Sequence, residues 1–162
     1  MSNLWLEHRL AAEGIRLLRA PVGDKYVHER MMAEGAVLGG EQSGHIIFSR
    51  HLFTGDGIVT ALSVLLVMAE TGRELADLAA ELVTYPQVLL NVRVREKKDL
   101  QAVPAIADSM RRVEARLAGN GRLLVRYSGT EPLLRVMIEG ESQASVQAWA
   151  EEIAEAVRTT IG

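Results

Sequence analysis

The segment RYSGTEPLLR, from Arg126 to Arg135, brings together side chains that suit the binding of a small anion. The two arginines that end it carry planar sets of N–H donors, and Ser128 and Thr130 add hydroxyl donors. Gly129 between them lets a ligand come close to the backbone N–H groups. We therefore predict a phosphate-binding turn made by Arg126, Ser128, Gly129, Thr130 and Arg135. The same residues also suit a plain hairpin turn in which the hydroxyls cap their own backbone.

A second segment, GGEQSGHIIF at residues 39–48, places a carboxylate, a hydroxyl and an imidazole in one glycine-rich turn. Glu41 can accept hydrogen bonds from two neighbouring hydroxyls, and Ser43 and His45 can each donate or accept. Such a set recognises a sugar by the orientation of its hydroxyls rather than by charge. We expect Glu41 and His45 to face solvent and to be unnecessary for the fold. A solvated hairpin without a ligand is the alternative.

A third segment, PVGDKYVHE at residues 21–29, opens a predicted helix. Asp24 and Lys25 can join the sugar site, or Gly23 and Asp24 can simply start the helix with Lys25 on its first exposed turn.

A metal site is disfavoured, because no pair of candidate ligands has the helical spacing that zinc sites commonly use. The residues weighed for it are Glu41, His45, His51 and Asp56.

The elements that must hold these segments are predicted from hydrophobic periodicity, which indicates a small α/β layer in the first half of the chain. Helices are expected over residues 3–14, 24–35, 58–69 and 74–82, and extended segments over residues 15–20, 36–40 and 45–48. The most apolar run, residues 58–69, is too short to span a membrane and is predicted to be a buried core helix capped by Asp56. Thr71 and Glu74 form a predicted capping box for the next helix.

The helical pattern stops at Pro86, and we place a domain boundary there, between residues 1–84 and residues 85–162. The second domain follows the order strand, helix, strand, strand, helix. This order predicts an antiparallel α+β layer with both helices on one face of the sheet and residues 126–135 at a turn. The side chains expected to pack on the sheet are Val103, Ile106, Met110, Val113 and Leu117 of one helix and Val146, Trp149, Ile153, Val157 and Ile161 of the other.

The composition, with 48% hydrophobic and 24% charged residues among 162, is that of a globular chain. The net charge of −3 and the absence of paired exposed aromatics on a strand argue against a nucleic-acid-binding module. The chain has no cysteine, which excludes disulfides and thiolate zinc sites and suits a reducing cytoplasm. We therefore expect a cytoplasmic protein with neither a nucleic-acid nor a membrane partner.

Several motifs, taken in their order and spacing, resemble the second half of the α-D-phosphohexomutases: MSNLWLE, VGDKYV, GGEQSGHIIF, TGDG and RYSGTEPLLRVMIEG. The resemblance covers nearly the whole chain and is greatest to bacterial members that act on glucosamine phosphate. Those members have G-D after the valine and S-G-T in the phosphate loop, as here, where related mutases often have G-H and S-N-T.

The resemblance implies an isomerase that interconverts glucosamine 6-phosphate and glucosamine 1-phosphate and supplies amino-sugar nucleotide and cell-wall precursor synthesis. Residues 1–84 would be part of the third, α/β domain, with Glu41, Ser43 and His45 in its sugar-binding loop. Residues 85–162 would be the fourth domain, whose loop grips the phosphate that is not transferred. A free-standing phosphosugar-binding module, and a mutase for mannose or glucose phosphate, remain the alternatives.

Four residues depart from the common family pattern. Tyr127 stands where proline or alanine is usual, and Lys25 where arginine is common. Ala20 replaces the common threonine and Trp5 the common glycine. Lys25 keeps the charge but loses the bidentate fork, which affects fine substrate preference. Tyr127 should point away from Arg126, because side chains alternate along a strand, although it can narrow the entrance of the loop.

The members of this family transfer a phosphoryl group between a phosphoserine and the sugar, with Mg²⁺ held by a run of aspartates in earlier domains. Neither a T-A-S-H-N-P-like loop nor a D-G-D-G-D-R run occurs here. We therefore expect the chain alone to be inactive and to bind no metal, with Mg²⁺ belonging to the full-length enzyme. By the resemblance, this is a carboxyl-terminal fragment whose partners are the amino-terminal domains and the phosphosugar. The partial third domain would leave a sheet edge open to self-association.

Overall fold

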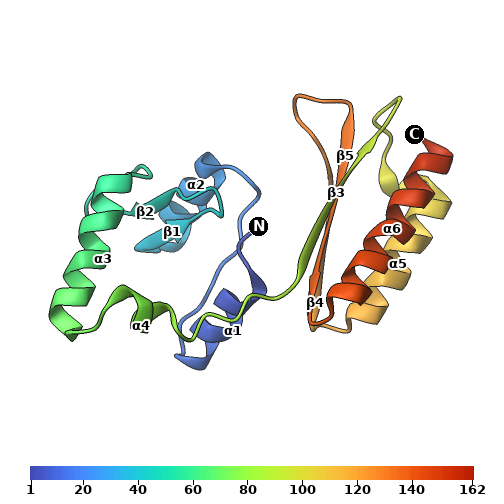
Figure 1. Ribbon diagram of the computed structural model, residues 1–162. Helices are drawn as coiled ribbons and strands as arrows, with labels where there is room; N and C mark the ends of the chain where they lie inside the picture. Colours follow the sequence, from blue (N-terminus) through green and yellow to red (C-terminus); the bar gives the residue numbers. More distant parts are fainter. The chain divides into compact units, whose positions relative to one another are not determined.

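The structure is a computed structural model that describes residues 1–162. The chain divides into two compact units, Met1–Val83 and Thr84–Gly162 (Figure 1). The first unit contains α1 (Leu4–Ala12), α2 (Asp24–Glu34), β1 (Leu38–Gly40), β2 (Ile46–Phe48), α3 (Gly57–Thr71) and α4 (Leu75–Ala79). The second contains β3 (Gln87–Arg93), the 3₁₀-helix η1 (Leu100–Ala102), α5 (Pro104–Leu117), β4 (Gly121–Tyr127), β5 (Leu133–Gly140) and α6 (Gln143–Thr160). None of the helices has both the length and the apolar composition needed to span a membrane.

In the first unit, β1 and β2 form an antiparallel hairpin, and α2 packs on it. Gly39 of β1 lies directly under this helix, where a Cβ atom would stand 2.9 Å from Cγ1 of Val27 and would also collide with Met31. The close approach buries Met31 and Ile47, which are 5% and 2% exposed. A glycine in the strand therefore lets α2 settle on the hairpin and fixes where the loop between β1 and β2 emerges.

Two local predictions for this unit are wrong. Residues 15–20 form no strand, because the only ladder here joins β1 to β2 and leaves that segment without a pairing partner. Thr71 does not cap α4 either. It is the last residue of α3, and its hydroxyl donates to the carbonyl of Val67 at 2.7 Å, while Glu74 is the residue that precedes α4.

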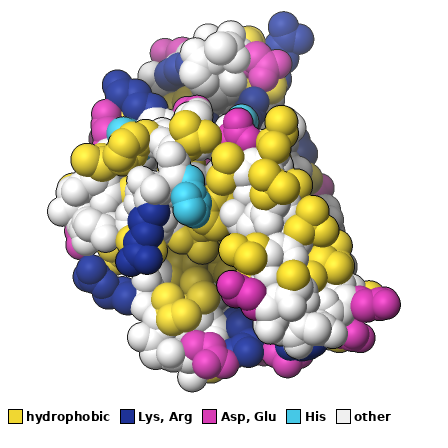
Figure 2. Space-filling model, turned by 90° about the vertical axis from the view of Figure 1, so that its left-hand side faces the viewer, with side chains coloured by type: hydrophobic (Ala, Val, Ile, Leu, Met, Phe, Trp, Pro, Cys, Tyr) yellow, Lys and Arg dark blue, Asp and Glu magenta, His cyan; other side chains and the backbone are white.

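The helix α3 is correctly predicted in place and in its cap, since Asp56 Oδ1 accepts from the N–H of Val59 at 2.8 Å. Its predicted burial is wrong, because no residue of α3 is buried. The exposed apolar side chains are Ile58, Leu62, Leu65, Leu66 and Val67. Figure 2 shows hydrophobic side chains gathered on the face of the molecule that carries this helix. An apolar run without polar alternation predicts burial, but the elements described in this unit cover too little of the helix to provide it.

The second unit has the predicted order of elements and the predicted antiparallel sheet, with strand order β3-β5-β4. Its central strand β5 pairs with both neighbours along its length. Helices α5 and α6 lie side by side on one face of the sheet (Figure 1). Proline at the first position of α5 and the Ser142 side chain at the start of α6 fix where the two helices begin.

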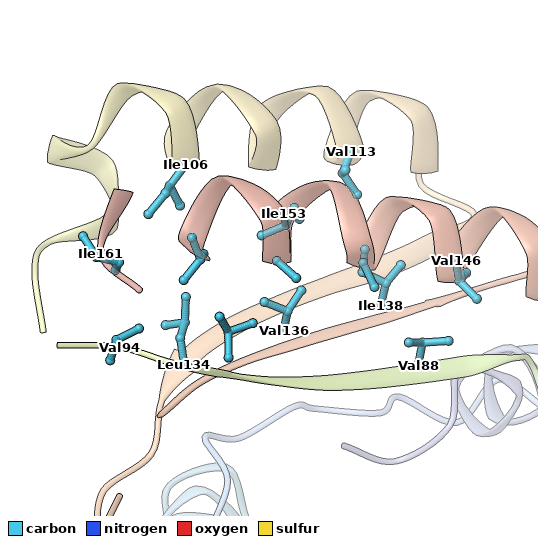
Figure 3. Close-up of a cluster of buried hydrophobic side chains, with 14 of the residues drawn as sticks. Val88, Val94, Ile106, Val113, Leu134, Val136, Ile138, Val146, Ile153 and Ile161 are labelled. Carbon is cyan, nitrogen blue, oxygen red and sulfur yellow. The ribbon is translucent and has the colours of Figure 1, made fainter. Parts of the chain in front are cut away.

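The core of the second unit lies between that face and the two helices. In Figure 3 the labelled strand residues Val88, Leu134, Val136 and Ile138 point toward labelled residues of the helices, among them Ile153. The predicted helix faces are confirmed. Ile106, Val113, Leu117, Val146, Ile153, Val157 and Ile161 are buried, and Val103, Met110 and Trp149 pack against them. This layer holds β4 and β5, and so determines where the turn between them is displayed.

Candidate functional site

The turn predicted to bind phosphate joins β4 to β5, and the two arginines of RYSGTEPLLR face each other across these strands. Arg126 is the register partner of Arg135. Directly opposed like charges destabilise a strand pair. Four residues back along β4, on the same side of the sheet, Arg122 instead faces Glu139, and Nε donates to the carboxylate at 2.8 Å. The cross-strand partner of Arg126 is therefore a second arginine, whereas deeper in the same sheet the partner of Arg122 is a carboxylate.

The guanidinium groups of Arg126 and Arg135 have N–H donors that make no hydrogen bond within the chain. Arg126 makes no side-chain hydrogen bond or ion pair within the chain. Arg135 donates to Glu131 at 3.3 Å through Nη2, but its Nε is buried without a partner. A buried N–H without an acceptor is costly. An anion held beside the two arginines would offset their repulsion.

Some backbone N–H groups of the turn form hydrogen bonds within the chain, and others do not. Ser128 N–H donates to the carbonyl of Leu133 at 2.8 Å, and Glu131 N–H donates to the Ser128 hydroxyl oxygen at 3.2 Å. The N–H groups of Gly129 and Thr130 make no hydrogen bond within the chain. Both residues are exposed, whereas Ser128 is 2% exposed. Ser128 thus forms the self-capping turn that the sequence also allowed, and the free backbone donors belong to the two residues after it.

Sequence reasoning missed Lys97, whose Nζ donates to the carbonyl oxygen of Ser128 at 2.7 Å. The loop that carries it is also held by Tyr127, whose phenol donates to the Lys98 carbonyl at 2.8 Å and accepts from the Lys98 N–H at 3.0 Å. As predicted, Tyr127 lies on the opposite side of the sheet from Arg126, since it packs against the core beneath the helices. The antiparallel register is the signal that could have located Lys97, because it brings the end of β3 beside the start of β5.

The loop between β1 and β2 holds the predicted sugar ligands close together. The Ser43 hydroxyl lies 3.0 Å from Nδ1 of His45, and that nitrogen lies 4.0 Å from the Glu41 carboxylate. Glu41 Oε1 also accepts from the N–H of Gly23 at 2.8 Å. That bond ties the loop to the segment that starts α2. Its carboxylate thus joins two loops, which argues against the expectation that Glu41 is unnecessary for the fold and makes the stability of Glu41→Ala the test of it.

Asp24 and Lys25 stand at the start of α2, as the helix-start alternative predicted, with Gly23 at a φ of 130° as the cap residue. The Lys25 ammonium is exposed and lies 3.7 Å from the Glu29 carboxylate one turn later. Asp24 and Lys25 line an open hollow of about 210 Å³. The other residues that line it are His28, Ile47, Phe53, Thr54 and Gly55. Gly55 lies against His45, where a Cβ atom would stand 2.9 Å from that of the histidine. The start of α2 and residues 53–55 thus line one depression, and His45 of the 41–45 loop lies against Gly55 at its border.

The described residues do not fit a magnesium site. No three histidine or acidic side chains come together in an arrangement that could hold a metal ion. Asp56, the carboxylate of the TGDG segment, is already engaged by the N–H of Val59. A hard cation such as Mg²⁺ requires several oxygen ligands at one point.

Comparison with known families gives two matches that together span most of the chain. Residues 1–85 match the model of phosphoglucomutase/phosphomannomutase alpha/beta/alpha domain III. Residues 89–156 match the model of the phosphoglucomutase/phosphomannomutase C-terminal domain.

Individual relatives agree with these matches. The chain is 53% identical over 162 residues to a phosphoglucosamine mutase of Solibacter usitatus and 49% identical over 162 residues to one of Geobacter metallireducens. It spans 36% of the length of each of these relatives. Among solved structures, it is similar to Aspergillus fumigatus N-acetylphosphoglucosamine mutase in complex with GlcNAc-6P and magnesium. The TM-score is 0.74 and the identity 21%, with 99% of this chain and 38% of the other covered. At that identity the likeness concerns the fold.

Proposed function

Because the chain belongs to the phosphoglucomutase/phosphomannomutase family, we propose that it provides the substrate-binding contacts of an enzyme that interconverts glucosamine 6-phosphate and glucosamine 1-phosphate. The relatives at 49% and 53% identity support glucosamine phosphate as the substrate, since both are phosphoglucosamine mutases. The turn at residues 126–135 binds the phosphate that is not transferred, and the 41–45 loop with the start of α2 binds the sugar.

The observation that carries this proposal is the direct pairing of Arg126 with Arg135 beside two free backbone N–H groups. A phosphate oxygen accepts well from guanidinium and backbone N–H donors, and hydrogen bonds to a charged group are the stronger kind. Bound phosphate would relieve the repulsion between the two arginines, which face each other across β4 and β5. The chemistry at this turn is therefore binding and orientation.

The second set of contacts supports recognition of a sugar. Ser43 and His45 are already hydrogen-bonded to each other and stand beside the Glu41 carboxylate. This arrangement offers both donors and acceptors to vicinal hydroxyls. Glu41 is held by the Gly23 N–H, so its second oxygen is presented in a fixed direction. A positioned carboxylate distinguishes hydroxyl orientations better than a mobile one.

The relatives are longer proteins, and we assign phosphoryl transfer to parts of the enzyme beyond these 162 residues. Those parts would supply the phosphoserine and the ligands of Mg²⁺, whose role in such a transfer is to neutralise phosphate charge. This chain would hold one end of the phosphosugar while the other end reacts. Holding a substrate in a reactive orientation lowers the entropic part of the barrier.

Titration of the isotopically labelled chain with inorganic phosphate and with glucosamine 6-phosphate, followed by NMR, tests the proposal. Both ligands should shift the amide signals of Gly129 and Thr130. Arg126→Ala should weaken phosphate binding by about 1.5–3 kcal/mol, the value of a hydrogen bond to a charged group. Arg111→Ala is the matched control, since Arg111 is an exposed arginine of α5 paired with Asp108 in the same unit. Equal affinity of wild type and Arg126→Ala would remove the phosphate role of the turn.

A further inference from the structure

Lys97 lies outside the phosphate-binding segment in sequence but touches it in space. Its Nζ donates to the Ser128 carbonyl at 2.7 Å. The strand β3 leads it there, because Arg93 pairs with Leu133 and the N–H of Val94 donates to the Pro132 carbonyl at 2.9 Å. The chain after β3 therefore passes directly beside the β4–β5 turn.

The Tyr127 phenol fixes this loop beside the turn. It donates to the carbonyl of Lys98 at 2.8 Å and accepts from the N–H of the same residue at 3.0 Å. Two consecutive residues of the loop are thus hydrogen-bonded to two consecutive residues of the hairpin. Lys97 pairs with Ser128, and Lys98 pairs with Tyr127. Tyr127, which departs from the common family pattern, therefore holds the loop beside the turn through these hydrogen bonds.

The carbonyl that Lys97 holds belongs to the same peptide group as the N–H of Gly129. No peptide bond in the chain is cis, so this group is planar and trans, and its C=O and N–H point in opposite directions. Fixing the direction of the Ser128 carbonyl therefore fixes the direction of the Gly129 N–H. A positive charge on the oxygen also polarises the amide and strengthens the N–H as a donor.

We propose that Lys97 is a positioning residue of the phosphate site, which aims and strengthens the Gly129 N–H through the Ser128 carbonyl. This inference rests on the proposed function of the turn. Its effect is local, since the ammonium acts on one of the two free backbone donors of the turn. Phosphate affinity should therefore depend on the place of this lysine and not only on its charge.

The neighbouring Lys98 provides a matched control. Its Nζ pairs with the Glu96 carboxylate at 2.7 Å and not with the turn. Lys98→Met and Lys97→Met remove the same charge from adjacent residues of one loop. A general electrostatic effect would weaken phosphate binding about equally in both variants, whereas a positioning effect would distinguish them.

The experiment is the NMR titration of the full 162-residue chain with inorganic phosphate, in wild type, Lys97→Met, Lys97→Arg, Lys98→Met, Tyr127→Phe and Arg126→Ala. Lys97→Met should raise the Kd for phosphate roughly tenfold, because the Gly129 N–H would no longer be held in direction and polarised by the ammonium. It should also reduce the shift that phosphate induces at the Gly129 amide more than the shift at Thr130. Lys97→Arg, which keeps a cationic donor, should restore most of the affinity. Tyr127→Phe should weaken binding in the same direction, and Lys98→Met should not.

Equal Kd values for Lys97→Met and Lys98→Met would overturn the positioning role. An unchanged Kd in Lys97→Met, with Arg126→Ala weakened, would also overturn it while leaving the phosphate-binding turn intact. If neither Arg126→Ala nor Lys97→Met changes the affinity, the proposed function of the turn fails as well. Should Lys97→Met not fold, Tyr127→Phe decides the question, because an unaltered phosphate affinity in that variant contradicts a role for the tied loop.

Discussion

Gly129 is the residue of the phosphate turn for which the fold itself gives no reason. A Cβ atom at this position would meet no atom within 4 Å, and its backbone does not adopt the left-handed conformation that favours glycine. We propose that glycine stands here to allow the close approach of a ligand.

We therefore expect Gly129→Ala to leave the stability of the second unit unchanged, or to raise it by about 0.4–1 kcal/mol through the unfolded state. Phosphate binding should fall about tenfold, because the methyl group occupies the space before the free N–H groups. Thermal melts and phosphate titrations measure the two effects. Gly119→Ala is the control in the same unit, since a φ of 84° makes alanine strained there. A loss of stability in Gly129→Ala equal to that control would assign the glycine to the fold instead.

Glu41 is a residue whose part in the fold could not be predicted from its own turn. The sequence indicates its neighbours Ser43 and His45, but the hydrogen bond from Gly23 joins it to a loop that lies 18 residues away. Lys97 was missed for the same reason, because its partner lies 31 residues along the chain. Residue types predict which groups can bind, and only the tertiary pairing determines which of them meet.

Glu41→Ala should lower the free energy of unfolding of the first unit by about 0.5–1.5 kcal/mol, the net value of one hydrogen bond. His45→Ala should change it by less than about 0.5 kcal/mol, since the histidine side chain is 55% exposed. Chemical denaturation of the two variants measures the difference. Equal losses would mean that Glu41 stabilises the loop through His45 and not through Gly23.

At the scale of elements, the second unit was predicted almost completely, because its helices are amphipathic and its strands are bounded by turn residues. The residues predicted to pack on the sheet are buried or packed against the core. The first unit was predicted less well. The run at residues 58–69 is apolar on all sides, so its sequence predicts burial without naming the surface that would cover it. The prediction of a strand at residues 15–20 was wrong, because a local sequence pattern does not show whether another strand is available to pair with it.

Helices α5 and α6 are joined by Glu152, which accepts from Nε of Arg112 at 2.9 Å and from Nη1 of Arg116 at 2.6 Å. Partial burial raises the pKa of this carboxyl, but the hydrogen bonds and charges of the two arginines outweigh it and hold the pKa below the ordinary value. A carboxylate with a lowered pKa stabilises the folded state at neutral pH, and that contribution is lost as the pH falls below its ordinary value.

Glu152→Gln should therefore lower the stability of the second unit by about 1 kcal/mol or less at pH 7, because all three side chains are partly solvated. The difference between variant and wild type should shrink as the pH falls below about 4.5, the ordinary value for a glutamate. Denaturation curves across that range measure it. A difference that stays constant with pH would show that the carboxylate charge is not the stabilising feature.

At the scale of the whole molecule, the order of the two units could be predicted from the sequence. The motifs of the two candidate sites occur along the chain in the same order as in the family that the sequence resembles. The candidate sites of the chain carry groups suited to phosphate and to sugar hydroxyls, and none brings together three metal-ligating side chains.

The purified 162-residue chain, given Mg²⁺ and a bisphosphorylated sugar, should not interconvert the two glucosamine phosphates. The reason is that its binding segments offer donors to a phosphate but no phosphoryl carrier. A coupled assay for glucosamine 1-phosphate, with the full-length Solibacter usitatus relative as the positive control, measures this. Turnover above the blank would show that the chain carries its own catalytic centre.

The central claim is that these residues bind the substrate of a phosphoglucosamine mutase, and an enzyme chimera tests it most directly. The aligned segment of the Solibacter usitatus relative, 53% identical, is replaced by residues 1–162, and the rate of glucosamine 6-phosphate conversion is measured. The chimera should be active and prefer glucosamine phosphate to mannose or glucose phosphate. Arg126→Ala in the chimera should lower kcat/KM at least tenfold, the equivalent of about 1.4 kcal/mol of transition-state binding. A folded chimera that lacks activity, or whose activity is indifferent to Arg126, would contradict the account.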